Sequence, residues 1–73
     1  MADVVIHISE SVDHDRRTAI ADAIRGQTGV MGVAHHDEKP HLLIVEYDPA
    51  SVKAMDLLQV ALDQHVHAQL VGL

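Results

Sequence analysis

Histidine is the residue type in this sequence with the clearest chemical potential, because seven histidines occur among only 73 residues. Imidazole is the commonest side-chain ligand for metal ions, and it gains or loses its proton near neutral pH. Six of the seven lie in or beside three short polar segments: His14, His35, His36, His41, His65 and His67. If the fold brings these segments together, the set could bind a divalent ion.

Two pairs of these histidines have spacings that would suit chelation. His36 and His41 flank a four-residue turn, so they would be cross-strand neighbours with Cβ atoms roughly 4.5–5.5 Å apart. His65 and His67 are two positions apart on an expected strand and would share a face. An Asp-His dipeptide before the first helix would add ligands near His65. The candidate metal ligands are therefore Asp13, His14, His36, His41, His65 and His67.

The ligand types decide which ions are candidates. Imidazole and carboxylate favour Zn, Ni, Co or Cu(II) over Cu(I). A simpler interpretation stays open, in which the histidines are solvated polar groups at strand ends and Asp13 or Asp15 caps the first helix. No Ser-His-Asp arrangement, glycine-rich phosphate loop or buried carboxylate pair is recognisable, so an enzyme is not expected.

Composition excludes several classes of function. A length of 73 residues predicts one domain, 1–73. The sequence has no cysteine, which excludes disulfides, thiolate metal sites and cysteine nucleophiles. A net charge of −6, with five basic residues that do not cluster, argues against nucleic acid as a partner. Neither a signal peptide nor an apolar run of about 20 residues is recognisable, so a cytoplasmic protein without membrane contact is expected.

The first half of the chain predicts a strand, a helix and a second strand. A β-branched run bounded by polar residues makes 4–8 the first strand. The helix follows a polar corner and runs to about Gln27, with an apolar stripe of Ile20, Ala23 and Ile24. The helical residues expected to face solvent are Arg16, Arg17, Asp22 and Arg25. The second strand is expected at 30–36.

The second half predicts a turn at 37–40, a strand at 41–47, a helix at 51–64 and a last strand at 65–71. The residues of this helix expected to face inward are Met55, Leu58, Ala61 and Leu62. With right-handed crossovers, this order of elements gives an α+β, ferredoxin-like βαββαβ sandwich. Its antiparallel four-stranded sheet has strand order 4-1-3-2, and both helices cover one face.

The other face of that sheet is expected to be open. The residues expected there on the two central strands are Val5, His7, Leu42, Ile44 and Glu46. Three of them are more apolar than a solvated face requires, so a protein partner or a second copy could dock there. Equally, a small sheet exposes a few aliphatic side chains without any partner.

Several short motifs stand at the boundaries of the expected elements. They are Ala23-Ile24, Gly29-Val30, Tyr47-Asp48-Pro49 and the closing Ala68-Gln69-Leu70-Val71. In this respect the sequence resembles the heavy-metal-associated domain family, which includes small copper chaperones and the N-terminal modules of metal-transporting ATPases. The resemblance spans essentially the whole chain, and it implies the same fold and a role in metal homeostasis.

The resemblance ends at the family's metal site, a Met-x-Cys-x-x-Cys motif whose two thiolates hold a soft ion. Its three ligand positions fall on Ser11, Asp13 and Arg16, none of which is a soft ligand, and the guanidinium would repel a cation. The family's Gly-aromatic pair after the second helix falls near His65-Val66. Cu(I) transport by thiolates is thereby excluded. Two functions remain: a divalent-metal module using His and Asp, and a metal-free interaction or self-associating module.

Overall fold

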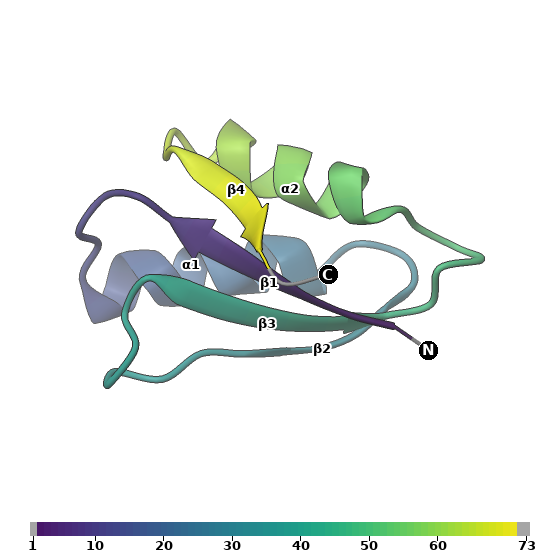
Figure 1. Ribbon diagram of the computed structural model, residues 1–73, viewed down its shortest axis with the longest axis horizontal. Coiled ribbons are helices and arrows are strands. Elements are labelled where there is room, and N and C mark those ends of the chain that lie inside the picture. The colour runs from purple at the N-terminus through teal and green to yellow at the C-terminus, as the bar shows by residue number, and fades with distance from the viewer. Residues whose placement is uncertain (1, 72–73) are drawn as a thin grey trace.

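The computed structural model describes residues 2–71, which form a four-stranded sheet and two helices arranged as two layers (Figure 1). In chain order the elements are β1 Ala2–Ile8, α1 His14–Arg25, β2 Val30–Ala34, β3 Leu42–Tyr47, α2 Ala54–Asp63 and β4 Ala68–Val71. All strand pairs are antiparallel, and the sheet order is β2-β3-β1-β4. The predicted ferredoxin-like topology and sheet order are therefore confirmed.

Strict alternation along β1 and β3 separates the two faces of the sheet. Val4, Ile6 and Ile8 are at most 1% exposed, and they pack with Leu43 and Val45 against the helices. The residues between them are partly or fully exposed, since neighbouring side chains on a strand point to opposite faces. The core is thus a single aliphatic layer between sheet and helices.

The first helix presents one unexpected residue to this layer. Ile20, Ala21 and Ile24 are fully buried, and Arg17 is only 2% exposed. The expectation that Arg17 faces solvent is therefore wrong. Positions 17, 20, 21 and 24 follow the i, i+3, i+4, i+7 spacing of one helix face, so geometry places the arginine at the head of the apolar stripe.

The second helix begins three residues later than predicted. Asp48 holds a turn before it, because its carboxylate accepts hydrogen bonds from the Ala50 backbone N–H and the Ser51 hydroxyl. As a result the buried residues of α2 are Leu57 and Ala61, with Leu58 partly buried. Met55 is 64% exposed and Leu62 is 37% exposed, so the prediction that both face inward is wrong. The inward stripe is therefore displaced by one residue from the predicted one, which corresponds to about 100° around the helix axis.

Gly29 joins α1 to β2 in a backbone conformation that ordinary residues disfavour, with φ at +92°. A Cβ at this position would lie 2.8 Å from the Cβ of Ser51 and 3.1 Å from Val52. Its carbonyl also accepts the Asp48 backbone N–H at 2.8 Å. The connection therefore requires glycine for both conformation and space.

We expect Gly29→Ala to lower the free energy of unfolding by about 2 kcal/mol, because a strained φ and a steric contact are both introduced. Urea unfolding followed by circular dichroism measures the effect. Gly32→Ala is the matched control, since a Cβ there meets no atom within 4 Å. Equal losses in the two variants would contradict the steric argument.

Candidate functional site

The connections β1–α1, β2–β3 and α2–β4 meet at one end of the molecule, on the left in Figure 1. The Ile8 backbone N–H donates to the His41 carbonyl, and the Ser9 N–H donates to the His67 carbonyl, both at 2.8 Å. Contacts between these connections also involve His14 and His35. The sequence expectation that histidine-bearing segments share one end is thus correct, and we call this the loop end.

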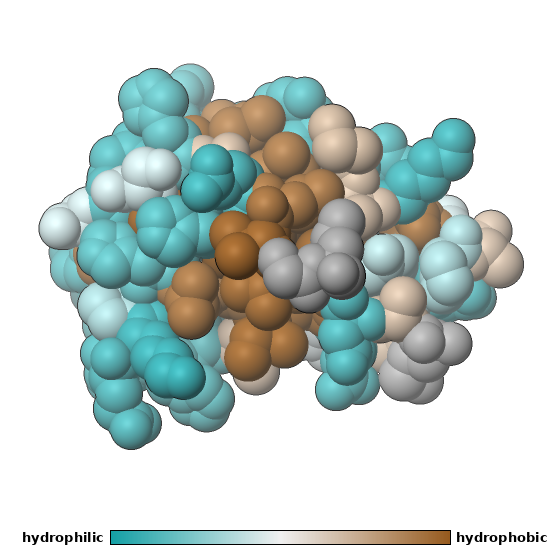
Figure 2. Space-filling model, in the orientation of Figure 1, coloured by the Kyte–Doolittle hydropathy of each residue, from teal (hydrophilic) through white to brown (hydrophobic). Residues whose placement is uncertain are grey.

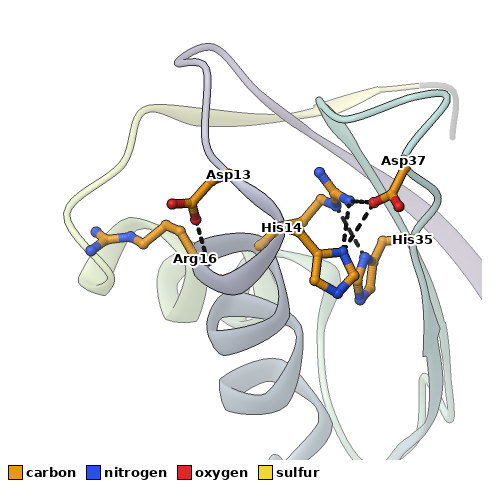
Figure 3. Close-up of polar contacts among 6 residues, drawn as sticks. Asp13, His14, Arg16, His35 and Asp37 are labelled. Atoms are coloured by element: carbon orange, nitrogen blue, oxygen red, sulfur yellow. Dashed lines mark hydrogen bonds and ion pairs between the residues drawn. The ribbon is translucent and has the colours of Figure 1, made fainter.

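The corner before α1 is occupied by two internal contacts. Asp13 is the N-cap of the helix, and its carboxylate accepts the Arg16 backbone N–H at 2.7 Å. The Arg16 side chain extends away from this cap and donates to the Gln64 carbonyl in the α2–β4 connection. Figure 3 shows Asp13 against the helix start, with the Arg16 side chain directed away from the histidines. The capping alternative for Asp13 is confirmed.

A second cluster forms around the buried Arg17 guanidinium, which we call the Arg17 cluster: Arg17, His14, His35 and Asp37. The Arg17 Nε donates to His35 Nδ1 at 3.0 Å, and Nη2 donates to the Asp37 carboxylate. His14 Nδ1 lies 3.0 Å from Asp37 Oδ1 and 3.4 Å from Arg17 Nη2. The labelled side chains of His14, His35 and Asp37 point toward one another in Figure 3. One guanidinium therefore holds the β2–β3 connection against α1.

Electrostatics in the cluster follow from this arrangement. Partial burial, together with the nearby Arg17 and His14 charges, lowers the pKa of His35 below its usual range. The hydrogen bond from His14, strengthened by the Arg17 charge, lowers the pKa of Asp37. Both shifts favour the same state near neutral pH, a neutral His35 accepting from Arg17 and an ionised Asp37.

His36 and His41 are not cross-strand neighbours, so the prediction that they pair across the turn is wrong. The β2–β3 ladder ends at Ala34 opposite Ile44, so both histidines belong to the longer connection between the strands. His36 is exposed, and its carbonyl accepts the Lys39 N–H. His41 Nδ1 lies 2.9 Å from the Ile8 carbonyl oxygen. The Asp37–Pro40 turn draws the chain out of the ladder before the pair can form.

The prediction that His65 and His67 share a face of the last strand is also wrong, because β4 begins only at Ala68. His65 has φ at +65°, a left-handed conformation that ends α2 where glycine is usual. His67 is exposed and contacts Glu10, whose carboxylate accepts the His67 backbone N–H at 2.6 Å and lies 3.0 Å from its Nδ1. That backbone hydrogen bond lowers the pKa of Glu10.

Metal-ligand geometry is absent from the described part of the chain: within residues 2–71, no three His, Asp or Glu side chains are grouped so that they could hold an ion. Asp13 is used as a cap and His41 bonds a backbone carbonyl. The ring centroids of His14 and His35 lie 5.9 Å apart, but the Arg17 cation stands beside both. Two imidazoles at most could share an ion here.

Sequence reasoning missed three participants: Arg17, Asp37 and Glu10. The signal for Arg17 was its position on the apolar stripe, three residues before Ile20. Asp37 and Glu10 lie in connections, and their contacts join residues 20 and 57 positions apart. Local patterns carry no information about such contacts.

Comparison with known proteins supports the fold. No protein-family model matches the sequence, and no curated protein matches it either. Solved structures do match. A copper-binding domain of HMA7, a P-type ATPase, has a TM-score of 0.88 and 17% identity, covering 99% of this chain and 96% of that one. Oxidised MerP from Ralstonia metallidurans CH34 has a TM-score of 0.86 and 17% identity, with 97% of each chain covered.

The CopZ metallochaperone is similar at a TM-score of 0.78 and 17% identity, over 96% of this chain and 100% of that one. The resemblance to heavy-metal-associated domains is therefore confirmed at the level of the fold. The HMA7 domain is a copper-binding domain and CopZ is a metallochaperone, whereas this chain lacks cysteine altogether. Neither helix within residues 2–71 has the length and apolar content to span a membrane.

We expect Arg17→Met to lower the free energy of unfolding by about 2–3 kcal/mol, because His35 loses its donor and the β2–β3 connection loses its link to α1. Arg25→Met is the matched control on the same helix. Arg25 is about half exposed, pairs with the exposed Asp22 and donates to the Val33 carbonyl at 3.0 Å, so its loss should cost only about 1 kcal/mol. Chemical denaturation of both variants provides the comparison, and similar values would contradict the bridging role of Arg17.

Stability is also expected to depend on pH. The pKa of His35 is lower in the folded state than in the unfolded state, so the unfolded chain takes up this proton first. The contribution of His35 to the stability of the folded state is fully present above pH 6.5, the usual pKa of histidine, and declines as the pH falls below this value. Further stability is lost below about pH 4, where the carboxylates of Asp37 and Glu10 take up protons, because the pKa of each is lowered in the folded state.

Replacing His35 with Asn, which keeps an acceptor but cannot titrate, should flatten the decline between about pH 6.5 and 5. Urea midpoints measured across this range test the expectation. His36→Asn is the control, because that ring is exposed and has no hydrogen bond to Arg17. An unchanged slope in the His35 variant would show that other groups cause the decline.

Proposed function

We propose that this protein is a metal-homeostasis-type module that acts through contacts with another protein and not by carrying an ion. It would be the metal-free counterpart of the metal-binding domains whose fold it shares. The observation that supports this proposal is the use of two arginines, Arg16 and Arg17, as the bridging cations of the loop end. A covalently attached guanidinium cannot be released, so it replaces a transferable ion with a permanent contact.

The position of Arg16 carries most weight. It stands where the resembling family has its second thiolate, and Asp13 stands where that family has the first. Here the carboxylate caps the helix and the guanidinium bonds the Gln64 carbonyl. A cation entering this corner would meet the fixed positive charge of Arg16, and one oxygen of the Asp13 carboxylate is already engaged by the helix cap. Both are unfavourable for Cu(I) and for divalent ions alike.

The class of partner is inferred from the proteins of similar structure, which include a P-type ATPase domain and a metallochaperone. We infer a protein partner from such a system, in the cytoplasm, with the open sheet face or the loop end as the contact surface. A net charge of −6 disfavours nucleic acid. No catalytic arrangement is proposed.

A second candidate function is weak binding of a divalent ion by histidine. It is favoured by the separation of 5.9 Å between the His14 and His35 rings, whose Nε2 atoms take no part in the hydrogen bonds of the Arg17 cluster. Zn, Ni, Co or Cu(II) would suit imidazole. The other expected ligands, Asp13, His36, His41, His65 and His67, would contribute only after rearrangement of the contacts described above.

The decisive experiment restores the thiolates. We expect the Asp13→Cys, Arg16→Cys double variant to withdraw Cu(I) from a chromophoric chelator at near one-to-one stoichiometry, because two thiolates then share the corner. The wild-type chain should withdraw none. Asp22→Cys with Arg25→Cys is the matched control, since it makes the same substitutions at the same spacing in the body of α1.

Calorimetric titration of the wild-type chain with Zn(II), Ni(II) and Cu(II), at about pH 7.5 and about pH 5.5, separates the two candidates. Weak binding that disappears at the lower pH and in His14→Ala would support the histidine site, because the ligands must be deprotonated. Binding by the wild-type chain with a dissociation constant well below about 1 µM would refute the metal-free proposal.

A further inference from the structure

β2 lies at an edge of the sheet and has β3 on one side (Figure 1). The Asp48 backbone N–H donates to the Gly29 carbonyl, so the even-numbered residues of β3 bond toward β2 and Val45 bonds toward β1. Val33 lies opposite Val45, and its N–H and carbonyl therefore point away from β3. The Arg25 side chain agrees with this direction, because its Nη2 donates to the Val33 carbonyl at 3.0 Å. This position of the edge is thus covered by an arginine side chain that is itself about half exposed.

Beside this edge the open face of the sheet is hollow. Gly32 and Ala34 are the residues of β2 on this face. They lie opposite Glu46 and Ile44 of β3, and they leave a hollow of about 210 Å³ because neither has a side chain larger than a methyl group. A second hollow of about 380 Å³ continues from Ile44 to the β2–β3 connection. Figure 2 shows apolar side chains gathered in the middle of this view, with hydrophilic ones on both sides.

The charge beside the hollow is not balanced within residues 2–71. Glu46 is exposed and lies opposite Asp3 of β1, and like charges opposite each other on neighbouring strands are destabilising. In that part of the chain no salt bridge includes either carboxylate. Two positions earlier on β3, Ile44 is 40% exposed. A strand that covers the hollow should therefore bring a basic and an apolar side chain, two residues apart on one face.

We propose that an extended segment of a partner protein adds to the sheet antiparallel to β2, and that it carries an apolar residue followed two positions later by Lys or Arg. Its backbone bonds Val33 in place of Arg25, as in other cases where a peptide extends a sheet. Its apolar side chain covers Ala34, and its basic side chain covers Gly32. The inference rests on the proposed function, because it names the surface and the partner chemistry through which a metal-free module acts.

Strand spacing explains why the basic side chain must be a long one. Neighbouring strands lie about 4.8 Å apart, so the added strand lies about 10 Å from β3. Lys or Arg can span most of this distance by crossing Gly32, where even a Cβ would meet no atom within 4 Å. The guanidinium of Arg25 keeps its ion pair with Asp22 on the same helix when it leaves the edge.

Charge also favours a foreign segment over a second copy of this chain. Each copy has a net charge of −6, so two copies repel each other. β2 itself reads Val-Met-Gly-Val-Ala, and it offers no cation to Glu46 of another copy. A charged side chain over an edge strand opposes pairing between copies. Arg25 therefore hinders self-association, while the carboxylate beside the hollow attracts a basic segment.

NMR titration of the isotope-labelled chain in EDTA tests the proposal, with the capped peptide Thr-Val-Thr-Leu-Thr-Arg-Thr as the probe. We expect amide shifts at Gly32, Val33 and Ala34. Hydrogen exchange of the Val33 amide should also slow, because its N–H gains a carbonyl acceptor in the added strand. The same peptide with Glu in place of Arg is the matched control, and it should bind at least about tenfold more weakly.

Two variants test the two features of the surface. Gly32→Val should weaken binding of the arginine peptide at least about tenfold, because its side chain blocks the path to Glu46 but meets open space in the free chain. Glu46→Gln should weaken binding about fivefold at low salt. Asp15→Asn removes the same charge from the first turn of α1 and should leave the affinity within about twofold. Thermal unfolding of each variant shows whether the chain stays folded.

Each other outcome has a definite meaning. Absence of the amide shifts, or shifts confined to the loop end, would overturn the docking surface and leave the metal-free function standing. Equal affinity for the two peptides would overturn the role of Glu46. Dimers of the wild-type chain in sedimentation equilibrium, with the same slow exchange of Val33, would show that a second copy occupies the edge. Peptide binding that requires added Zn(II) would instead contradict the metal-free function.

Discussion

A guanidinium buried at the start of α1 must be paired, and the loop end is arranged around that requirement. Taking a charge out of water costs several kcal/mol unless opposite charge and hydrogen-bond acceptors surround it. Arg17 meets this condition only because His35 and Asp37 come from the β2–β3 connection. The connection is thereby fixed to the helix, and β3 enters the sheet from a defined position. The side chains of β3 that point to the helices then pack into the core.

The consecutive residues Arg16 and Arg17 each bond a different connection at the loop end. The Arg17 side chain reaches the β2–β3 connection, and the Arg16 side chain reaches the α2–β4 connection at Gln64. The capping carboxylate of Asp13 fixes the backbone from which both side chains start. Guanidinium suits this purpose because it presents several N–H donors in a fixed plane and keeps its charge at every relevant pH.

The fold could be predicted from sequence because its strands alternate cleanly. In β1 the residues Val4, Ile6 and Ile8 are all buried, so the period of two was a reliable signal. The same approach failed for α2, where apolar residues surround most of the helix and the periodicity admits more than one inward face. The stripe through Leu57 and Ala61 is the one that is buried. The turn held by the Asp48 side chain, which delays the helix start, is not visible in hydrophobic periodicity either.

The candidate site was less predictable, for a different reason. That the histidine-bearing connections share one end follows from topology, and it was deduced correctly. Which side chains touch depends on where each strand starts and stops. Here β2 already ends at Ala34, and β4 begins only at Ala68. A shift of two residues moves a histidine from a strand position, where its neighbours are fixed, to a loop, where they are not. His35 therefore accepts a hydrogen bond from Arg17, a residue that the sequence had predicted to face solvent.

A metal ion and a guanidinium solve the same structural problem in different ways. Each places positive charge where several connections present carboxylates, carbonyls or ring nitrogens, and each orders those connections. An ion does so reversibly, because its ligands must compete with water and with other ligands. The guanidinium of Arg17 is attached to the chain and only 2% exposed, so the order it creates is permanent while the chain is folded. Its dependence on pH then comes from the acceptors, above all His35, and not from loss of the cation itself.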